Sequence, residues 1–356
     1  MTASSTEFRL MVEACRWVFA GGDPGNVHRL CHIADFARFV RVVRFHRVQG
    51  LVWNSLWVNR AQVPTDAANT LSADAAAIAA ANLRMAAEAS SLRAEFDEAA
   101  IPLLFVKGLT VGALAYPNPM LKMGWDIDLL IDPAQLEAAV ERLQARGYRQ
   151  VVPPASVDFR PWHERRKESV WSRDPGIDVE LHTRLADNLE LIPTIDVHSS
   201  RQHVRVLPGT VLPTLARDEL FAYLCVHGAS SNWFRVKWIV DVAALIHGAS
   251  SAELTRLYAR SQELGAFRAA GQALLLADRL FGSLAGTSLR ERLTEDRTGS
   301  WLADAAFRQL AGRTEPREPT AVPLGTWRIH MTQLGLKPGV AFKFGEISRQ
   351  VTDAFF

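Results

Sequence analysis

The chain of 356 residues contains 40 lysines and arginines and 38 aspartates and glutamates, which gives a formal net charge of +2 at pH 7. This balance provides no overall field that would single out nucleic acid or an anionic membrane as the partner. The three cysteines, Cys15, Cys31 and Cys225, are too widely spaced for a disulfide framework or a zinc site. No segment has the pattern of a signal peptide or the ~18 consecutive apolar residues of a spanning helix. We therefore expect a cytoplasmic protein with no membrane partner.

Residues 1 to about 60 predict helices on both sides of a glycine-rich break at 21–25. From Phe36 onward, apolar residues follow the i, i+3, i+4, i+7 spacing of an amphipathic helix. A three-residue step falls short of a helical turn by about 60°, so charges at that step spiral around the helix. We interpret such charges here as a solvated flank and not as a phosphate-binding stripe. They are Arg38, Arg41, Arg44 and Arg47.

The alanine-rich segment at 71–100 predicts one long helix. Its larger apolar residues are spaced by seven, seven and four, which places them on one helical face. Residues so placed pack into a core far more often than they bind a ligand. We expect this helix to lead into the central part of the chain. The residues are Ile78, Met85, Leu92 and Phe96.

The central part alternates between strand and helix patterns, which indicates a sheet with helices packed on it. The predicted strands are 101–106, 126–131, 148–152, 169–173 and 177–182, and the predicted helices are 109–115 and 133–146. The charged run at 163–168 is expected in a loop. Beyond about residue 213 strand signals fade, and the predicted helices are 216–228, 233–247, 252–264 and 266–281. The last forty residues give no clear pattern.

Two carboxylates begin the second predicted strand. Alternate side chains of a strand share a face, so Asp126 and Asp128 point the same way while Ile127 points into a core. Their repulsion is relieved if a divalent cation lies between them, and Mg²⁺ takes hard oxygen ligands of this kind, usually together with substrate phosphates. Upstream, Lys107 and Gly108 form a turn where a cation and free backbone N–H groups meet phosphate oxygens, although Lys107 also fits an ordinary surface lysine.

Four short motifs together resemble a known protein family. They are Lys107-Gly108, Tyr116-Pro117, Asp126-Ile127-Asp128-Leu129-Leu130 and Val179-Glu180-Leu181-His182. A glycine turn, an Asp-x-Asp strand and a third carboxylate on a later strand resemble the nucleotidyltransferase superfamily with the DNA polymerase β-like catalytic fold, and within it the bacterial nucleotidyltransferase family proteins. The resemblance runs from about His46 to Asp241. It departs from the superfamily at Gly108-Leu109, where Gly-Ser is usual, which weakens any role for a hydroxyl at this turn.

The resemblance implies an α+β fold, in which a small mixed-sheet, polymerase β-like catalytic module is flanked by helical regions. We expect an N-terminal helical region at 1–98, a nucleotidyltransferase catalytic domain at 99–212 and a C-terminal helical domain at 213–356. In nucleotidyltransferases generally, such a C-terminal module covers the nucleotide from one side.

The third carboxylate has two candidates, because Asp178 and Glu180 lie on the same face of their predicted strand, with His182 next along. By default such alternating polar residues form the exposed side of an edge strand. The resemblance favours Glu180, whose implied role is to complete a metal site and to accept the proton of the attacking hydroxyl. Asp178 remains a further candidate metal ligand.

The segment from His227 to Asp241 resembles the second signature of the family. Arg235 and Lys237 are candidate triphosphate ligands, and Asp241 is a candidate partner for one of them. Trp233 and Trp238 are candidates for stacking on a base, although the helical spacing of Trp238 with Val242 and Leu245 favours a core position.

The mechanism implied is Mg²⁺-dependent nucleotidyl transfer with two ions. Asp126 and Asp128 hold both ions on a nucleoside triphosphate, Glu180 assists, and an acceptor hydroxyl or phosphate displaces pyrophosphate. The near-neutral charge favours a small-molecule or peptide acceptor over a long nucleic acid. The principal alternative is a non-catalytic module that binds a nucleotide or a protein partner on the same fold.

Overall fold

The computed structural model describes residues 4–174, 176–312, 315, 317–321 and 324–354. Helices lie on both sides of the glycine-rich break, as the sequence predicts, and four of them precede the long helix. Three of them begin at a residue whose side chain accepts a backbone N–H of the first turn, which is the usual N-cap: Ser5, Asp23 and Asp35. The helices are α1 (Thr6–Ala20), α2 (Pro24–Cys31), α3 (Phe36–His46) and α4 (Gln49–Val58).

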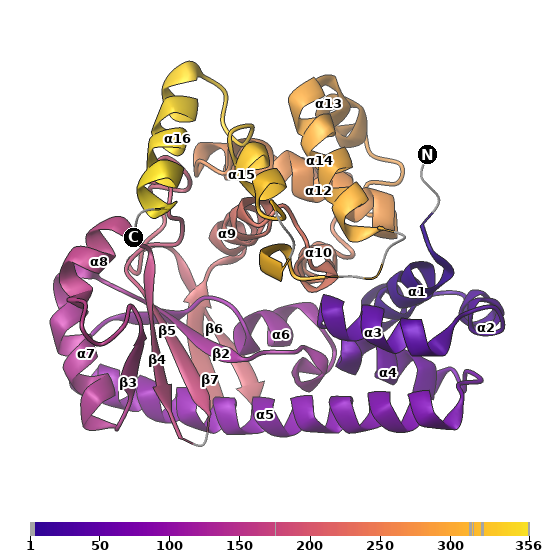
Figure 1. The fold of residues 1–356 in the computed structure, drawn as a ribbon, viewed down its shortest axis with the longest axis horizontal. Coiled ribbons are helices and arrows are strands. Elements are labelled where there is room, and N and C mark those ends of the chain that lie inside the picture. Colours follow the sequence, from indigo (N-terminus) through magenta and orange to yellow (C-terminus); the bar gives the residue numbers. More distant parts are fainter. Residues whose placement is uncertain (1–3, 175, 313–314, 316, 322–323, 355–356) are drawn as a thin grey trace.

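Helix α5 (Thr65–Glu98) is the longest element, with 34 residues. A helix of this length spans about 51 Å, and it runs beneath both the N-terminal helices and the sheet (Figure 1). The apolar face predicted for it is confirmed, because Ile78, Met85, Leu92 and Phe96 are all buried. This helix therefore joins the N-terminal helices to the sheet.

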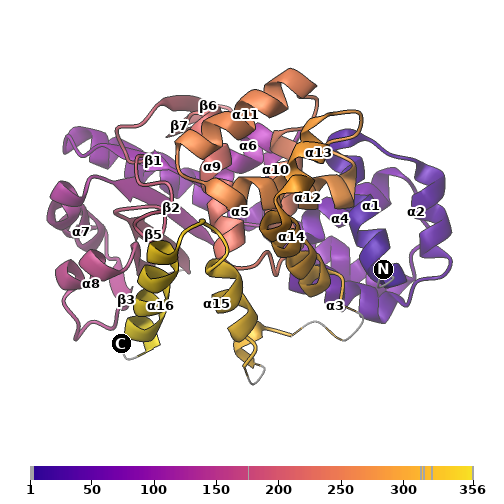
Figure 2. The same ribbon diagram turned by 90° about the horizontal axis from the view of Figure 1, so that it is seen from above.

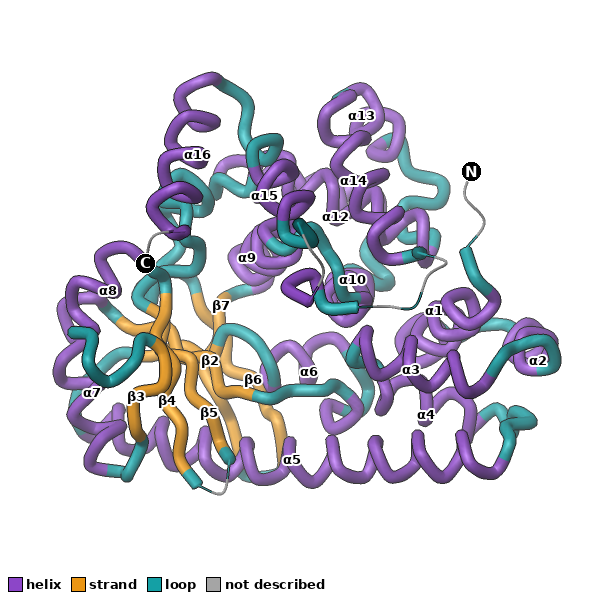
Figure 3. The backbone as a smooth tube through the Cα atoms, viewed as in Figure 1, coloured by secondary structure: helices purple, strands orange, loops and turns teal. Residues whose placement is uncertain are grey.

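The predicted central strands form one five-stranded mixed sheet in the order β1-β2-β5-β4-β3 (Figure 3). The pairing of β2 with β5 is parallel and the other three pairings are antiparallel. The mixed α+β class is thus confirmed. The strands are β1 (Leu103–Phe105), β2 (Asp126–Ile131), β3 (Arg149–Val152), β4 (Glu168–Arg173) and β5 (Ile177–His182).

Two features of the central part differ from the sequence prediction. The charged run was expected in a loop, but its first three residues end helix α8 (Phe159–Arg165). A second sheet was not predicted: β6 (Arg201–Leu207) pairs antiparallel with β7 (Thr210–Leu215). Pro213 lies inside β7, and a proline within an apolar run argues against a strand. The remaining elements are α6 (Leu109–Ala115), α7 (Leu136–Ala145), η1 (Pro119–Leu121) and η2 (Pro133–Gln135).

Helices then make up the rest of the chain, and the four predicted after residue 213 are confirmed. In Figures 1 and 2 these helices lie over the sheet and the N-terminal helices. They are α9 (Arg217–Ser230), α10 (Val236–Leu245), α11 (Ser251–Glu263), α12 (Phe267–Phe281), α13 (Leu289–Glu295), α14 (Arg297–Leu310), α15 (Trp327–Gln333) and α16 (Val340–Ala354), with the short turn η3 (Pro319–Ala321).

The two faces of β2 belong to two different apolar clusters. Ile127 and Leu129 pack with α5 and α7, whereas Leu130 packs into a cluster formed by the N-terminal and C-terminal helices. Because side chains alternate along a strand, Asp126 and Asp128 lie on the same face as Leu130, toward the C-terminal helices. The N-terminal and C-terminal helices share one apolar cluster and do not form separate cores. The domain limits at 98/99 and 212/213 stay a prediction.

None of the described helices is both long enough and apolar enough to cross a membrane.

Gly50, the second residue of α4, allows that helix to approach η1 closely. A Cβ at this position would lie 2.4 Å from the carbonyl oxygen of Leu121, a backbone atom that must shift to make room. We predict that Gly50→Ala lowers the free energy of unfolding by about 1–3 kcal/mol, the usual cost of overpacking. Urea titration measures this change.

Gly271→Ala is the matched control, because Gly271 is also a buried helical glycine. A Cβ there would meet no atom nearer than 3.4 Å, so the better helix propensity of alanine should raise the stability by about 0.5–1 kcal/mol. If Gly50→Ala is as stable as the wild type, the close approach of α4 to η1 is contradicted.

Candidate active site

The parallel pairing of β2 with β5 brings the predicted carboxylates together. In this register Asp126 lies opposite Asp178, and Asp128 lies opposite Glu180. Leu130 lies opposite His182, which ends β5. Residues that are 52 positions apart in sequence therefore place carboxylates side by side, on the face that the C-terminal helices cover.

Lys107 and His182 hold Asp128 and Glu180 in a compact cluster. The Lys107 Nζ lies 2.6 Å from Asp128 Oδ1 and 3.5 Å from Glu180 Oε2. The His182 Nε2 lies 3.2 Å from Asp128 Oδ1 and 3.5 Å from Glu180 Oε2. One ligand atom from each of Asp128, Glu180 and His182 lies within 4.8 Å of the others, which is close enough to share a metal ion.

The charges of this cluster keep Glu180 ionised. Burial alone would raise the pKa of Glu180, but the Lys107 ammonium and the hydrogen bond from His182 hold that pKa well below its usual range. Burial alone would likewise lower the pKa of His182, yet the charge of Glu168 and the hydrogen bonds to Asp128 and Glu180 raise it. The Glu168 carboxylate lies 3.2 Å from His182 Nδ1. His182 thus lies between the two carboxylates on its Nε2 side and the charge of Glu168 on its Nδ1 side.

Asp126 differs from Asp128 and Glu180 because no described cation pairs with it. It makes no hydrogen bond or ion pair with any other described residue, and it is half-buried. Burial and the charges of Asp128 and Glu180 raise its pKa to about 7. A bound divalent cation would favour its ionised form.

A cavity of about 370 Å³ opens over these residues and is lined on another side by three cations. The Lys122 Nζ is paired with Asp241 Oδ2 at 3.3 Å, and Tyr116 donates a hydrogen bond to the other oxygen of Asp241 at 2.8 Å. Lys237 has no ion-pair partner among the described residues; burial and the charges of Lys122 and Arg47 lower its pKa to about 7. Asp241 is thus shared between Lys122 and Tyr116, and this side of the cavity carries more cations than anions.

The structure brings most of the predicted site residues into this cavity. Asp241 pairs with Lys122 and not with Arg235 or Lys237. Trp238 was expected in the core, but it is half-buried and lines the cavity next to His227, with ring centroids 5.5 Å apart. The predicted residues that line the cavity are Lys107, Gly108, Asp126, Asp128, Glu180 and Lys237.

Three predicted candidates lie elsewhere. Arg235 is 3% exposed, and its guanidinium stacks on Phe45 and Phe234 at 5.0 and 5.1 Å and pairs with Glu318. Trp233 is fully buried beneath Gly228. Asp178 pairs across β2 and β4 but does not line the cavity.

Arg47 and Lys122 were not identified from the sequence. Arg47 belongs to the arginine series interpreted as a solvated flank, and this interpretation holds for Arg41 and Arg44, which form exposed ion pairs with Glu315 and Asp74. Arg47 differs because α3 ends there in a left-handed conformation with φ of 59°, and its side chain lines the cavity. Lys122 lies in a loop without any periodic pattern.

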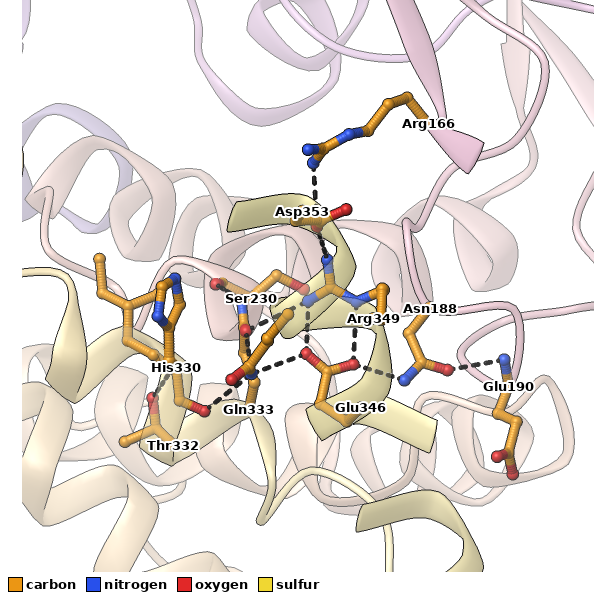
Figure 4. A network of polar contacts seen from close by, with 12 residues as sticks. Arg166, Asn188, Glu190, Ser230, His330, Thr332, Gln333, Glu346, Arg349 and Asp353 are labelled. Atoms are coloured by element: carbon orange, nitrogen blue, oxygen red, sulfur yellow. Dashed lines mark hydrogen bonds and ion pairs between the residues drawn. The ribbon is translucent and has the colours of Figure 1, made fainter. Parts of the chain in front are cut away.

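The C-terminal helices provide a polar wall that the sequence did not reveal (Figure 4). Asp353 of α16 pairs with Arg166 at 2.9 Å and with Arg349 at 2.7 Å. The buried Glu346 accepts hydrogen bonds from Arg349 at 3.1 Å and from Asn188 at 2.6 Å. This network anchors α16 to the sheet side of the cavity. The polar residues of the wall that line the cavity are Asn188, Gln333, Glu346 and Arg349.

The donor set of the cavity fits a hard divalent cation. Asp126, Asp128 and Glu180 supply only carboxylate oxygens, the ligand type that Mg²⁺ prefers. Asp126 is a half-buried carboxylate without a partner among the described residues. The cations on the neighbouring side match phosphate groups that such an ion usually carries.

Comparison with protein-family models matches residues 33–282 to a family described as an uncharacterised nucleotidyltransferase. A comparison with curated proteins gave no match. The matched segment covers more than half of the chain and contains every carboxylate and cation of the cavity named above except Arg349 and Glu346. The chain therefore belongs to this nucleotidyltransferase family.

Proposed function

We propose that the protein transfers a nucleoside monophosphate from a nucleoside triphosphate to a hydroxyl or phosphate of an acceptor, with Mg²⁺ and with release of pyrophosphate. The observation that carries this proposal is the division of one cavity into two charged sides. Three carboxylates, Asp126, Asp128 and Glu180, line one side, and cations without enough anionic partners line the other.

The cationic side fits the phosphates of the donor. Within the part of the chain that the structure describes, Lys237 and Arg47 lack a carboxylate partner at ion-pair distance. Lys122 pairs with Asp241, which also accepts a hydrogen bond from Tyr116. A triphosphate supplies the missing charge. Gly108, with φ of +59°, exposes the backbone at the start of α6 to the same cavity. Arg235 is not assigned to the phosphates, since its guanidinium is buried against Glu318.

The carboxylate side fits the metal. Asp126 and Asp128 would hold two Mg²⁺ ions with Glu180 as the third carboxylate, and such ions stabilise the entering and leaving oxygens of an in-line displacement. Glu180 takes this role in preference to Asp178, because Asp178 does not line the cavity. Glu180 lies next to His182 and takes up the proton of the attacking hydroxyl, directly or through water.

The nucleobase and the acceptor share the remaining walls. Burial and the nearby lysines lower the pKa of His227 well below its usual value, so this imidazole is neutral and forms an aromatic surface with Trp238. The wall of α15 and α16 limits the space to a cavity of about 370 Å³. This enclosure favours a small molecule or a peptide segment as the acceptor over a long nucleic acid.

A non-catalytic nucleotide-binding or protein-interaction module is the alternative, and one observation favours it. The ammonium of Lys107 pairs with both Asp128 and Glu180 and compensates part of their charge. In that case Asp126→Asn would leave the biological output unchanged in a folded protein, whereas a nucleotidyltransferase would lose its activity.

We predict a Mg²⁺-dependent increase in thermal stability with one of ATP, GTP, CTP or UTP. A ligand at 100 times its Kd adds about 2.7 kcal/mol to the folded state. The variant Asp126→Asn/Asp128→Asn should lose the nucleotide-dependent increment. Only this increment is compared, because removing two like charges also changes the stability of the free protein. No increment for any of the four nucleotides in the folded wild type contradicts a preformed donor site.

Lys237 and Arg235 are two residues apart and offer a matched pair of substitutions. Lys237→Met should abolish most of the increase in thermal stability that the nucleotide causes. Without nucleotide, this variant should be at least as stable as the wild type, because it removes a half-buried ammonium that has no ion-pair partner among the described residues. Arg235→Met should lower the stability of the free protein and keep the increment, because it breaks the buried contact with Glu318. If Arg235→Met loses the nucleotide-dependent increment and Lys237→Met keeps it, then Arg235 and not Lys237 binds the phosphates.

The pH dependence of nucleotide binding should depend on Lys237. Its pKa is about 7 in the free protein, so the side chain loses its charge as the pH rises through that value, and phosphate affinity falls with it. Lys237→Arg keeps the charge throughout. We predict that from pH 6 to 8 the affinity of the wild type falls relative to that of Lys237→Arg, measured by calorimetry. The nucleotide and Asp126 titrate in both proteins, so the comparison isolates the contribution of Lys237. If the affinities of the two proteins change in parallel with pH, this role of Lys237 is contradicted.

A further inference from the structure

The ammonium of Lys107 lies between two acids of the cavity, the buried Asp128 and the half-buried Glu180. Its Nζ is 2.6 Å from Asp128 Oδ1 and 3.5 Å from Glu180 Oε2, and these are the residues grouped as a candidate metal site with His182. We propose that Lys107 is an internal counter-cation that closes the carboxylate site to free metal ions, and that the site accepts a divalent cation only as its complex with a nucleoside triphosphate. This inference rests on the proposed function.

Lys107 must move before Asp128 can bind a metal. Its Nζ lies 2.6 Å from Asp128 Oδ1, so it occupies the space next to this oxygen from which a metal ion would bind. A divalent cation on the same carboxylate oxygen would meet this ammonium at contact distance, where like charges repel strongly in a buried site.

A displaced Lys107 needs a new anionic partner. Once a metal occupies Asp126, Asp128 and Glu180, the other described acids of the cavity already have partners. Glu168 pairs with Lys167, Glu346 pairs with Arg349, and Asp187 accepts the backbone N–H of Lys167. Asp241 is already paired with Lys122 and hydrogen-bonded to Tyr116. The other charged groups on that side are the cations Arg47 and Lys237. A free metal ion would thus leave Lys107 buried and unpaired, which is strongly unfavourable.

A nucleotide removes this obstacle. Lys107 lines the cavity with a flexible four-carbon chain, and 16% of the side chain is exposed toward it. Phosphate oxygens that arrive with the metal give the ammonium a partner within the same space. The binding of metal and the binding of nucleotide therefore favour each other, and by linkage the coupling is the same in both directions.

The test measures the binding of Mn²⁺ without nucleotide. The electron paramagnetic resonance signal of the free ion gives the fraction that is not bound. Mn²⁺ takes the same oxygen ligands as Mg²⁺. We expect Lys107→Met to bind Mn²⁺ more tightly than the wild type by about tenfold or more, a typical size for such coupling. Lys237→Met is the matched control: it removes one charge from the same cavity, but Lys237 pairs with neither Asp128 nor Glu180, so its effect should be clearly smaller.

Thermal unfolding gives a second measurement. Mn²⁺ alone should leave the wild type unchanged and stabilise Lys107→Met, whereas Mn²⁺ with nucleotide should stabilise the wild type. Lys107→Gln, which also removes the charge but keeps a polar group of similar length, replaces Lys107→Met if that variant fails to unfold cooperatively. Equal Mn²⁺ affinity in the wild type and the folded Lys107 variant overturns the proposal, as does tight binding of Mn²⁺ alone by the wild type.

Failure of the proposed function would look different. If no nucleotide stabilises the wild type while the Lys107 variant still gains Mn²⁺ affinity, nucleotidyl transfer is contradicted and the counter-cation role of Lys107 is supported. If nucleotide and metal stabilise the wild type while Lys107 variants bind Mn²⁺ no better, the counter-cation role alone is overturned.

Discussion

The parallel register between β2 and β5 is the constraint on which the site depends. It sets Asp128 directly beside Glu180, and it does so on a face that is buried, so the two charges must be compensated within the protein. The neighbouring strand β1 ends just before Lys107, and β5 itself ends at His182. These two residues provide the compensation. The opposite face of β2 anchors the arrangement, because Ile127 and Leu129 pack with α5 and α7.

Two parts of the chain contribute differently to the cavity. The segment matched by the family, 33–282, carries the carboxylates, Lys107 and the cations of the phosphate side. The wall formed by Gln333, Glu346 and Arg349 lies outside that segment. The family match therefore includes the carboxylates and the neighbouring cations of the cavity, and it leaves out the part of the wall that α15 and α16 supply.

The spacing of residues along the sequence predicted the features that the geometry of a single strand or helix determines. Strand alternation placed Asp126 and Asp128 on one face, and helix periodicity located the buried face of α5. The misses concern tertiary contacts. Arg235 is the N-cap of α10 and has an extended backbone, whereas Lys237 is the second residue of the helix. Helical periodicity therefore does not relate the directions of these two side chains, and no sequence pattern shows which one faces the cavity. Arg47 and Lys122 enter the site only because α3 ends and η1 packs against Gly50.

The electrostatics of the cavity favour a ligand that carries both signs of charge. The pKa of Asp126 is raised to about 7 and that of Lys237 is lowered to about 7, so both groups are displaced toward their neutral forms. A metal ion alone would restore the charge of Asp126 but would repel Lys237 and Lys107. A phosphate alone would restore the charge of Lys237 but would be repelled by three carboxylates. A metal–triphosphate complex satisfies both sides at once, and this is why a near-neutral chain can contain a strongly charged site.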